Sequence, residues 1–281
     1  MRKVALLTDS SPYIPQELIE DLNIGIVPLI LQWDDKTYYD SVDIQPKEFY
    51  TRLAKSSTIP ITSQVTVKQF DDAFGKLLED GYDVLALLIS SGISGTVDSA
   101  VQSKKNFPNA SIEIVDSQLA SMALGFMVLE AARAAKEGAS LVECKAIAEA
   151  AFPKIGVYFT VDSLKYLHKG GRINTAKRLL GSTLSIKPLM ELRDGKIELV
   201  ESVISRKKAI QRMLDLTAKR IGESKPVRIA VFHALVEEEA LSMLETAKER
   251  FQPIESILTD VSPAIGTHTG PGTLSIAYIA G

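Results

Sequence analysis

The stretch Ser90-Ser91-Gly92-Ile93-Ser94-Gly95-Thr96 lies between the apolar residues 84–89, which are typical of a buried strand, and residues 97–102, which have the composition of a helix start. Such a strand–turn–helix unit gathers free N–H groups and hydroxyls at the positive end of a helix dipole, where an anion is stabilised. The turn contains no Lys, so it is not the phosphate loop that ends in Gly-Lys-Ser/Thr. Two interpretations fit it: a site for a carboxylate or phosphate, and an ordinary helix-capping turn.

The composition is normal for a soluble globular protein. The 281 residues are 46% hydrophobic and 24% charged, which predicts one large domain or two smaller ones. A net charge of −3 gives no general attraction to nucleic acid or anionic membranes. The single Cys144 allows neither an intrachain disulfide nor a cysteine metal cluster. The apolar run before Asp9 is too short for a signal peptide or a membrane span, so we expect a cytoplasmic protein without stable membrane insertion.

The order of predicted elements indicates an α/β fold with two domains. In residues 1–152, strands alternate with helices, which predicts a doubly wound, mainly parallel sheet. In residues 153–281, an Asp194-Gly195 turn between two apolar runs predicts a hairpin, and helices follow, which indicates an α+β domain. A ligand would then lie in the cleft between the domains. The predicted elements are strands at 4–7, 84–89, 112–115, 157–161, 184–192, 196–203, 227–232, 256–260 and 274–280, and helices at 16–22, 47–55, 67–80, 119–136, 141–151, 209–221 and 237–250.

Two segments are expected to be irregular because they are rich in polar residues, Gly or Pro. They are residues 56–64 and the loop 266–272, which contains His268. An Asp-Ser pair also follows three of the predicted strands. Helix capping is the favoured role for Asp116 and Asp162, whereas Asp9 is also a candidate to face a cleft at the carboxyl end of its strand.

Ser94 and His268 are the candidates for chemistry. The nucleophile pattern Gly-x-Ser-x-Gly is not met, because Thr96 stands where the second Gly belongs. A triad is defined by geometry and not by chain order, so a serine esterase or acyl-transfer enzyme that uses these two residues stays open. No set of His, Asp and Glu has metal-ligand spacing, so no metal site is expected. The alternative for His268 is a surface histidine in a loop.

Two basic stretches follow the predicted domain boundary. One spans residues 165–178 and the other residues 206–212. A basic run is ordinarily a solvated face. The alternative is that these runs flank a cleft and receive a phosphorylated product or an acidic partner. Nucleic acid is the weaker interpretation because aromatic residues are not interleaved with the cations.

Taken together and in this order, the motifs resemble those of the bacterial DegV family, which includes the fatty-acid-binding subunits of fatty acid kinase. The resemblance runs over nearly the whole chain, and no single motif carries it. The motifs are Thr8-Asp9-Ser10, Thr62-Ser63-Gln64, Ser91-Gly92-Ile93-Ser94-Gly95-Thr96, Asp116-Ser117, Lys169-Gly170-Gly171-Arg172-Ile173, Ile186-Lys187-Pro188 and His268-Thr269-Gly270-Pro271-Gly272.

The resemblance implies a carrier that binds one long-chain fatty acid, such as palmitate, between two domains and has no enzyme activity or cofactor of its own. By the family's pattern, the carboxylate is bound by Thr62 and Ser94, with His268 as a third contact and Arg172 near the head group. The carrier would present that carboxylate to a separate ATP-dependent kinase subunit, and Arg206 is a candidate contact for the kinase or the acyl phosphate. Residues expected near the carboxylate are Ser63, Gly95, Thr96 and Thr269.

The sequence departs from the family's pattern at two positions. Ile61 stands where a second Thr is common, and Asn174 where Ser often follows the Gly-Gly-Arg-Ile run. Neither change removes a proposed ligand. Chain length, saturation, kinase identity, tunnel-lining residues and oligomeric state stay open. A tail of about fifteen methylenes, at about 0.8 kcal/mol each, is worth on the order of 12 kcal/mol before the costs of binding. Tail burial is therefore expected to dominate affinity, while the carboxylate contacts set orientation.

Overall fold

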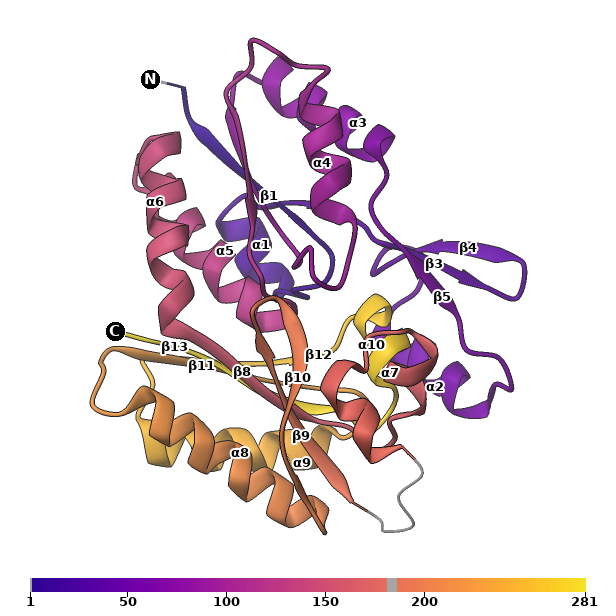
Figure 1. Cartoon of the computed structure of the whole chain (residues 1–281). Coiled ribbons are helices and arrows are strands. Elements are labelled where there is room, and N and C mark those ends of the chain that lie inside the picture. Colours follow the sequence, from indigo (N-terminus) through magenta and orange to yellow (C-terminus); the bar gives the residue numbers. More distant parts are fainter. Residues whose placement is uncertain (1, 181–185) are drawn as a thin grey trace.

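The computed structural model describes residues 2–180 and 186–281. Its first sheet is parallel and has the strand order β2-β1-β6-β7, formed by β1 (Val4–Asp9), β2 (Gly25–Val27), β6 (Asp83–Leu88) and β7 (Ile112–Asp116) (Figure 1). The two central strands are buried almost throughout, as apolar strands covered on both faces are. This arrangement confirms the predicted parallel sheet.

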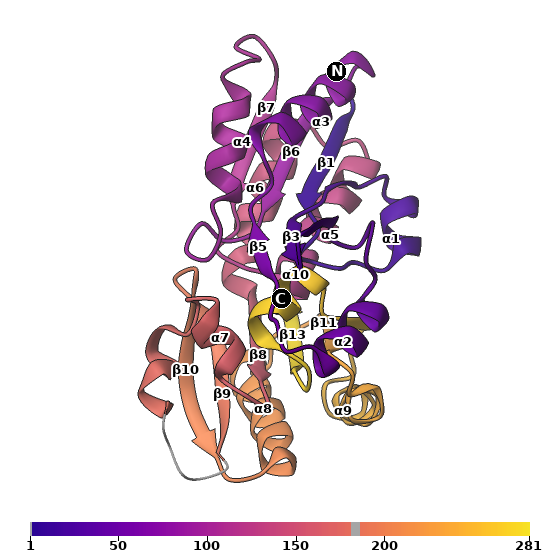
Figure 2. The ribbon, with the colours of Figure 1, turned by 90° about the vertical axis from the view of Figure 1, so that its right-hand side faces the viewer.

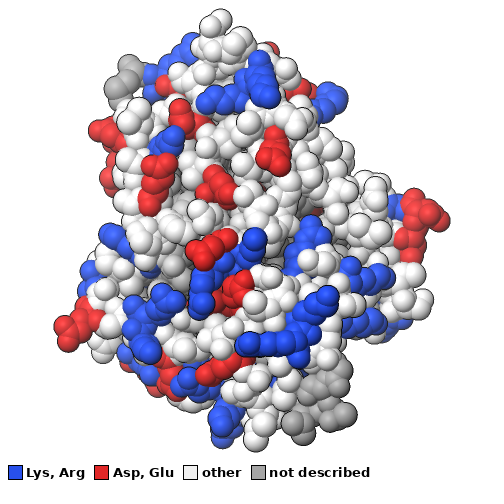
Figure 3. Space-filling model, viewed as in Figure 1, with Lys and Arg blue, Asp and Glu red and all other residues white. Residues whose placement is uncertain are grey.

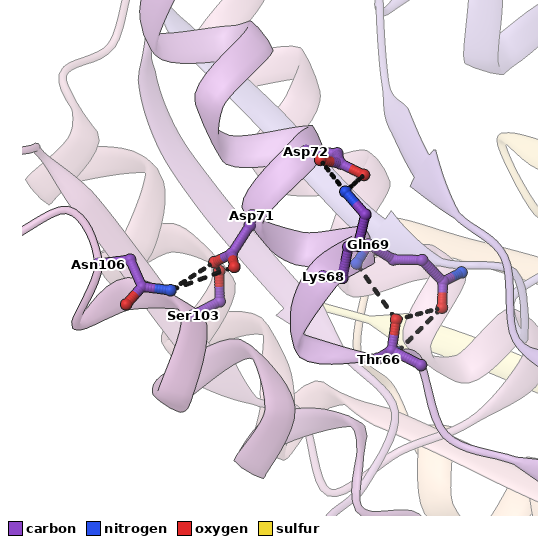
Figure 4. A network of polar contacts seen from close by, with 7 residues as sticks. All are labelled: Thr66, Lys68, Gln69, Asp71, Asp72, Ser103 and Asn106. Atoms are coloured by element: carbon purple, nitrogen blue, oxygen red, sulfur yellow. Dashed lines mark hydrogen bonds and ion pairs between the residues drawn. The ribbon is translucent and has the colours of Figure 1, made fainter.

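Helices cover both faces of this sheet. On one face lie α3 (Val67–Glu79) and α4 (Thr96–Lys104), and on the other lie α5 (Ser121–Lys136) and α6 (Leu141–Ala151), while the short α1 (Gln16–Asp21) connects β1 to β2 (Figure 1). A capping box starts α3: Thr66 accepts from the backbone N–H of Gln69, whose side chain accepts from the backbone N–H of Thr66 (Figure 4). Asp71 then accepts hydrogen bonds from Ser103 and Asn106, which ties α3 to the end of α4.

The second sheet is mixed and has the order β10-β9-β8-β13-β11-β12. Only β11 and β12 pair in parallel, and α8 (Arg206–Ile221) and α9 (Glu237–Phe251) pack on one face (Figure 2). The predicted hairpin is confirmed. Its turn residues Asp194 and Gly195 both have positive φ, as a two-residue primed turn requires. The strands are β8 (Ile155–Thr160), β9 (Lys187–Arg193), β10 (Lys196–Val203), β11 (Val227–His233), β12 (Glu255–Asp260) and β13 (Leu274–Ala280); residues 184 and 185 of the predicted first hairpin strand lie outside the described residues.

Helix α5 lies between the two sheets and contacts strands of both. Its first twelve residues are buried except Glu130, because the helix is apolar on nearly every side. One continuous hydrophobic core contains Leu85 of β6, Phe126 of α5 and Phe232 of β11. The two sheets therefore share a core through α5. The division of the chain at residue 152 stays a prediction.

A third, antiparallel sheet of order β4-β3-β5 borders the space between the two larger ones. It is formed by β3 (Ile30–Trp33), β4 (Lys36–Tyr39) and β5 (Ile61–Ser63), and the helix α2 (Pro46–Lys55) lies between β4 and β5 in the chain. The short helices α7 (Lys165–Lys169) and α10 (Pro263–Thr269) pack against each other, and the short 3₁₀ helices η1 (Phe152–Lys154) and η2 (Asn174–Leu179) complete the elements.

Several expectations from the sequence were wrong. Residues 56–64 are not wholly irregular, because residues 61–63 pair with β3. His268 is in the last turn of α10 and not in a loop, since Ser262 caps this helix and Pro263 begins it. Asp116 and Asp162 do not cap helices. Asp116 accepts from the backbone N–H and hydroxyl of Ser91, and Asp162 forms an ion pair with Lys187.

Candidate functional site

A cavity of about 460 Å³ lies between the two large sheets, at the end where α5 and α10 begin. Its volume falls in the range of about 300–1,000 Å³ that is usual for sites of small molecules. Most of the exposed wall is apolar, and both halves of the chain supply it: Leu29 and Ile89 from one, Phe159, Ile197 and Phe232 from the other. An apolar molecule in this space would be removed from water by residues far apart in the sequence.

Part of the wall is polar. Thr62 on β5, Ser94 in the turn before α4, and His268 on α10 all line the cavity. The structure thus brings together the three residues that the sequence singled out. Ser63, Gly95, Arg172 and Thr269 line the cavity as well, whereas Thr96 is buried behind Ser94.

The Ser94 hydroxyl is held by the turn that contains it. Its Oγ lies 2.9 Å from Oγ1 of Thr96 and accepts a hydrogen bond of 3.3 Å from the Thr96 backbone N–H. The N-cap residue of α4 is Gly95, which has no side chain to cap the helix. The hydroxyls of Ser94 and Thr96 thus stand at a helix N-terminus, where the dipole favours an anion.

His268 is hydrogen-bonded to Thr62, with 2.7 Å between His268 Nε2 and Thr62 Oγ1. Its other ring nitrogen, Nδ1, is buried and has no partner among the described residues. Burial, and to a lesser extent the positive charge of Arg172, lowers the pKa of His268 to about 4. The imidazole is therefore neutral near pH 7.

A neutral imidazole carries its proton on one nitrogen only. We assign it to Nε2, because a buried N–H at Nδ1 would lack an acceptor. Nε2 then donates to Thr62 Oγ1, and the hydroxyl proton of Thr62 is free to point into the cavity. In this arrangement His268 orients Thr62 so that its hydroxyl can donate to a group in the cavity.

Gly170 sets the position of the imidazole. A Cβ atom at Gly170 would lie 2.0 Å from His268 Nδ1, so any side chain there would displace the ring. Gly170 ends α7 with φ −77°, a conformation open to every residue. Close approach, and not backbone conformation, therefore requires glycine here.

Arg172 supplies the positive charge of the site. Its Nε donates to the carbonyl of Ile93 at 3.1 Å, and its Nη1 donates to the carbonyl of Gly170. The first bond joins the Gly-Gly-Arg turn of one half of the chain to the Ser94 turn of the other. The guanidinium is consequently fixed beside the polar part of the cavity.

Helix α10 is anchored at its start by Asp40, which the sequence did not single out. Asp40 is fully buried, accepts from the backbone N–H of Ala264 at 3.0 Å, and accepts from the Ser10 hydroxyl at 2.5 Å. Burial raises the pKa of Asp40 to about 7. Tyr50 adds a second anchor, donating to the carbonyl of Val261 at 2.8 Å. No motif signals Asp40, because its role depends on segments more than 200 residues apart.

Two other candidates lie away from the cavity wall. Asp9 is fully buried and accepts from the backbone N–H groups of Ser11 and Ile89, so its role is to join strand ends and not to face the cleft. Arg206 lies at the start of α8, forms an ion pair with Glu239 at 2.8 Å, and donates to the carbonyl of Gly272. Figure 3 shows Lys and Arg concentrated in the lower half of one face, with Asp and Glu among them.

The geometry does not favour a serine nucleophile. Thr62, and not Ser94, is the hydrogen-bond partner of His268, and Ser94 pairs with Thr96. His268 Nδ1, which a triad acid would have to contact, has no partner within the described ranges. A base without an orienting acid and without a bond to the serine lacks the arrangement that activates the hydroxyl.

The part of the chain that the structure describes holds no group of three or more His, Cys, Asp or Glu residues able to bind a metal ion. Within residues 2–180 and 186–281, none of the helices combines the length and apolar character that crossing a bilayer requires.

Comparisons with solved structures identify the same architecture elsewhere. A protein from Thermus thermophilus, described as a fatty-acid-binding DegV family protein, superposes with a TM-score of 0.94 at 31% identity, covering all of both chains. DegV of Bacillus subtilis, described as a fatty acid binding protein, gives 0.90 at 32% identity, again over all of both chains. A stearic-acid-binding protein from Eubacterium ventriosum gives 0.91 at 25% identity, over 100% of this chain and 98% of the other.

Sequence comparison gives the same result. Protein DegV of Bacillus subtilis is 34% identical over 277 residues, which are 98% of each chain. A DegV domain-containing protein of Clostridium perfringens is 34% identical over 287 aligned residues, 99% of this chain and 98% of the relative. The model of the DegV family of uncharacterised proteins matches residues 3–281. The chain therefore belongs to the DegV family.

Proposed function

We propose that this protein is a carrier that binds a long-chain fatty acid in the cavity between its sheets, with the carboxylate at Thr62, Ser94 and His268. One observation carries the proposal: a mainly apolar cavity of about 460 Å³ has in its wall the hydrogen-bonded pair Thr62–His268, the Ser94 hydroxyl, and Arg172, which is bonded to the turn that contains Ser94. That pattern matches a molecule with one anionic end and a long apolar body. The fatty acids bound by the relatives from Thermus thermophilus and Eubacterium ventriosum are of this class.

The carboxylate would be held by donors that replace its water. The Thr62 hydroxyl, freed by its bond from His268, and the Ser94 hydroxyl at the start of α4 supply two hydrogen bonds. Arg172, fixed to Ile93 and Gly170, supplies the opposite charge. Because the imidazole is neutral, its contribution is to orient Thr62 and not to neutralise the anion.

We further propose that the protein is not an enzyme by itself but presents the carboxylate to a separate, ATP-dependent kinase in the cytoplasm. In that reaction a carboxylate oxygen forms a bond to the γ-phosphorus of ATP. The bond from that phosphorus to the β,γ-bridging oxygen breaks, and ADP leaves with the electron pair. Ser63, which is exposed and lines the cavity, and Arg206, at the start of α8, are candidates for contact with the kinase.

The first test is native mass spectrometry of the purified protein, followed by solvent extraction and identification of what is released. A near-stoichiometric fatty acid of about fourteen to twenty carbons, a length suited to a cavity of this volume, is the expected result. If the protein is free of lipid, palmitate is added and thermal unfolding is measured. A ligand specific to the folded state must raise the transition temperature. No bound lipid and no shift with palmitate would contradict the carrier proposal.

The kinase role needs its own measurement. A candidate kinase and ATP are added to the palmitate-loaded protein, and ADP release is compared with that from palmitate alone. Release that requires the loaded carrier supports presentation. Turnover of an acyl ester by the carrier alone, abolished in Ser94→Ala, would instead support an esterase.

A further inference from the structure

Two buried hydroxyl groups in the cavity wall have no partner in the protein. Ser121 is 7% exposed and Ser275 is 1% exposed, and both line the cavity. Neither hydroxyl forms a hydrogen bond with any residue within 2–180 and 186–281. The other polar side chains of the wall either have a partner or, like Ser63, are exposed; those with a partner are Thr62, Gln64, Thr66, Ser94, Arg172, His268, Thr269 and Thr273.

Ser275 lies in the middle of an apolar floor. Successive residues of a strand point to opposite faces of the sheet. Leu274 and Ile276 belong to the hydrophobic core that β13 shares with α8 and α9, so Ser275 faces the other side. There it pairs in register with Phe159 of β8 and Phe232 of β11, and both phenylalanines line the cavity. The Ser275 hydroxyl therefore faces the part of the cavity that would enclose an apolar chain.

Ser121 approaches the cavity from the other half of the chain. It is the first residue of α5, which lies over the second sheet on the face opposite to α8 and α9 and contacts β8 and β13 (Figure 1). The backbone N–H of Ser90 donates to the carbonyl of Leu119 at 2.9 Å, which joins the start of α5 to the turn before α4. The neighbouring Ala120 also lines the cavity.

The small size of a serine does not explain its presence on the floor. Ala277 lies two residues further along the same face of β13, in register between Val157 and Ala230. An alanine at position 275 would occupy almost the same volume, without the cost of removing a hydroxyl from water. A plain hydrocarbon chain offers no atom that offsets this cost. The two serines therefore indicate a ligand with a hydrogen-bonding group on its chain.

We propose that the cavity binds long-chain fatty acids that carry a hydroxyl group on the chain, and that Ser275 and Ser121 pair this hydroxyl. The inference rests on the proposed carrier function and names the class of fatty acid that the cavity distinguishes. A hydroxyl group both donates and accepts, so it is complementary to the hydroxyl of a serine. With the carboxylate held at Thr62 and Ser94, a chain hydroxyl reaches a serine only from certain carbons, so its position along the chain decides whether it is paired.

The test compares stearate with a series of hydroxystearates, each with one hydroxyl group at a different carbon. They are titrated against delipidated protein by displacement of a fluorescent fatty acid. In the wild type, at least one isomer should bind within about threefold of stearate, because its hydroxyl is paired. The remaining isomers should bind about tenfold more weakly than stearate, because they bury a hydroxyl without a partner. We call the first kind the paired isomers.

The variants are Ser275→Ala, Ser121→Ala and, as an exposed control on α9, Ser242→Ala. The two buried variants should bind a paired isomer about tenfold more weakly than the wild type does. They should bind stearate at least as well, because the alanine removes an unpaired hydroxyl, and for the same reason their thermal unfolding should occur at or above the wild-type temperature. Ser242→Ala should bind every ligand as the wild type does.

The order of affinities among the isomers decides the outcome. A changed order in Ser275→Ala or in Ser121→Ala supports the proposal and assigns the paired hydroxyl to that serine. An order that both variants leave unchanged overturns it, and so does an equal weakening of stearate and of every isomer. If the wild type binds stearate but binds all hydroxystearates about tenfold more weakly, only this inference fails. If it binds neither stearate nor any hydroxystearate, the carrier function fails as well.

Discussion

Substitution of Gly170 by alanine tests whether His268 controls the carboxylate site. The new Cβ atom would lie 2.0 Å from His268 Nδ1, and real Cβ atoms essentially never approach another heavy atom within 3.0 Å. The ring or the α7 turn must therefore move by about 1 Å. The bond of 2.7 Å from His268 to Thr62 cannot keep its geometry after such a shift.

The expected consequences differ for stability and for binding. Overpacking of this kind costs about 1–3 kcal/mol of unfolding free energy. For a chain of this length that lowers the transition temperature by about 2–6 °C. Loss of the oriented Thr62 donor should weaken palmitate binding about ten- to a hundredfold, because a hydrogen bond to a charged group is worth about 1.5–3 kcal/mol. The backbone itself accepts alanine, since Gly170 has φ −77°.

The neighbouring glycine is the matched control. Gly171 has φ +71°, and a Cβ atom there would have no neighbour within 4 Å. Gly171→Ala should therefore lose about 1 kcal/mol or more of stability through backbone strain, without touching His268. Thermal unfolding and palmitate titration are measured for both variants. The reasoning is refuted if both bind palmitate equally well, or if His268 titrates in Gly170→Ala as it does in the wild type.

Three further predictions follow from the site. Burial raises the pKa of Asp40 from 3.8 to about 7. Between pH 3.8 and pH 7 the folded state therefore binds more protons than the unfolded state. The contribution of Asp40 to stability is consequently lost as the pH rises through that window. In urea unfolding, the difference in unfolding free energy between the wild type and Asp40→Asn should fall by about 4 kcal/mol between pH 4 and pH 8. A difference that stays constant over this range would contradict the prediction. The His268 ring, whose pKa is about 4 in the free protein, should show a higher pKa by NMR once palmitate is bound, because a carboxylate stabilises the imidazolium; an unchanged value would place the carboxylate elsewhere. Ser94→Ala should reduce presentation to the kinase more than it reduces lipid content, and complete loss of bound lipid would show that the tail does not dominate affinity.

Periodicity and turn chemistry predicted most of the fold. The apolar residues 84–89 and the Gly/Ser turn after them gave a strand and a helix start where β6 and α4 lie. The hairpin turn was predictable because Asp194-Gly195 suits positive φ at both positions. Both signals are local, since they depend on the conformational preferences of a few adjacent residues.

Expectations failed where contacts between distant segments decide the structure. Residues 61–63 form a strand because β3 offers them an edge, although their own composition is that of a loop. Gly, Thr and His around His268 suggest a loop, yet Ser262, Pro263 and the buried Asp40 start a helix there. Asp116 pairs with Ser91 across neighbouring strand ends instead of capping the next helix. In each case tertiary contacts outweighed a weak local preference.

The sequence by itself singled out residues that line the cavity: the hydroxyls of Thr62 and Ser94, His268, and Arg172 of the Gly-Gly-Arg turn stand out by type and spacing. Only the tertiary structure decided how they act. Thr62 and His268 are 206 residues apart, and their hydrogen bond exists because α10 packs beside β5. Burial then makes the imidazole neutral, and among the described residues its one hydrogen-bond partner is Thr62. Such properties follow from the removal of water and from distances between folded segments, which residue order does not specify.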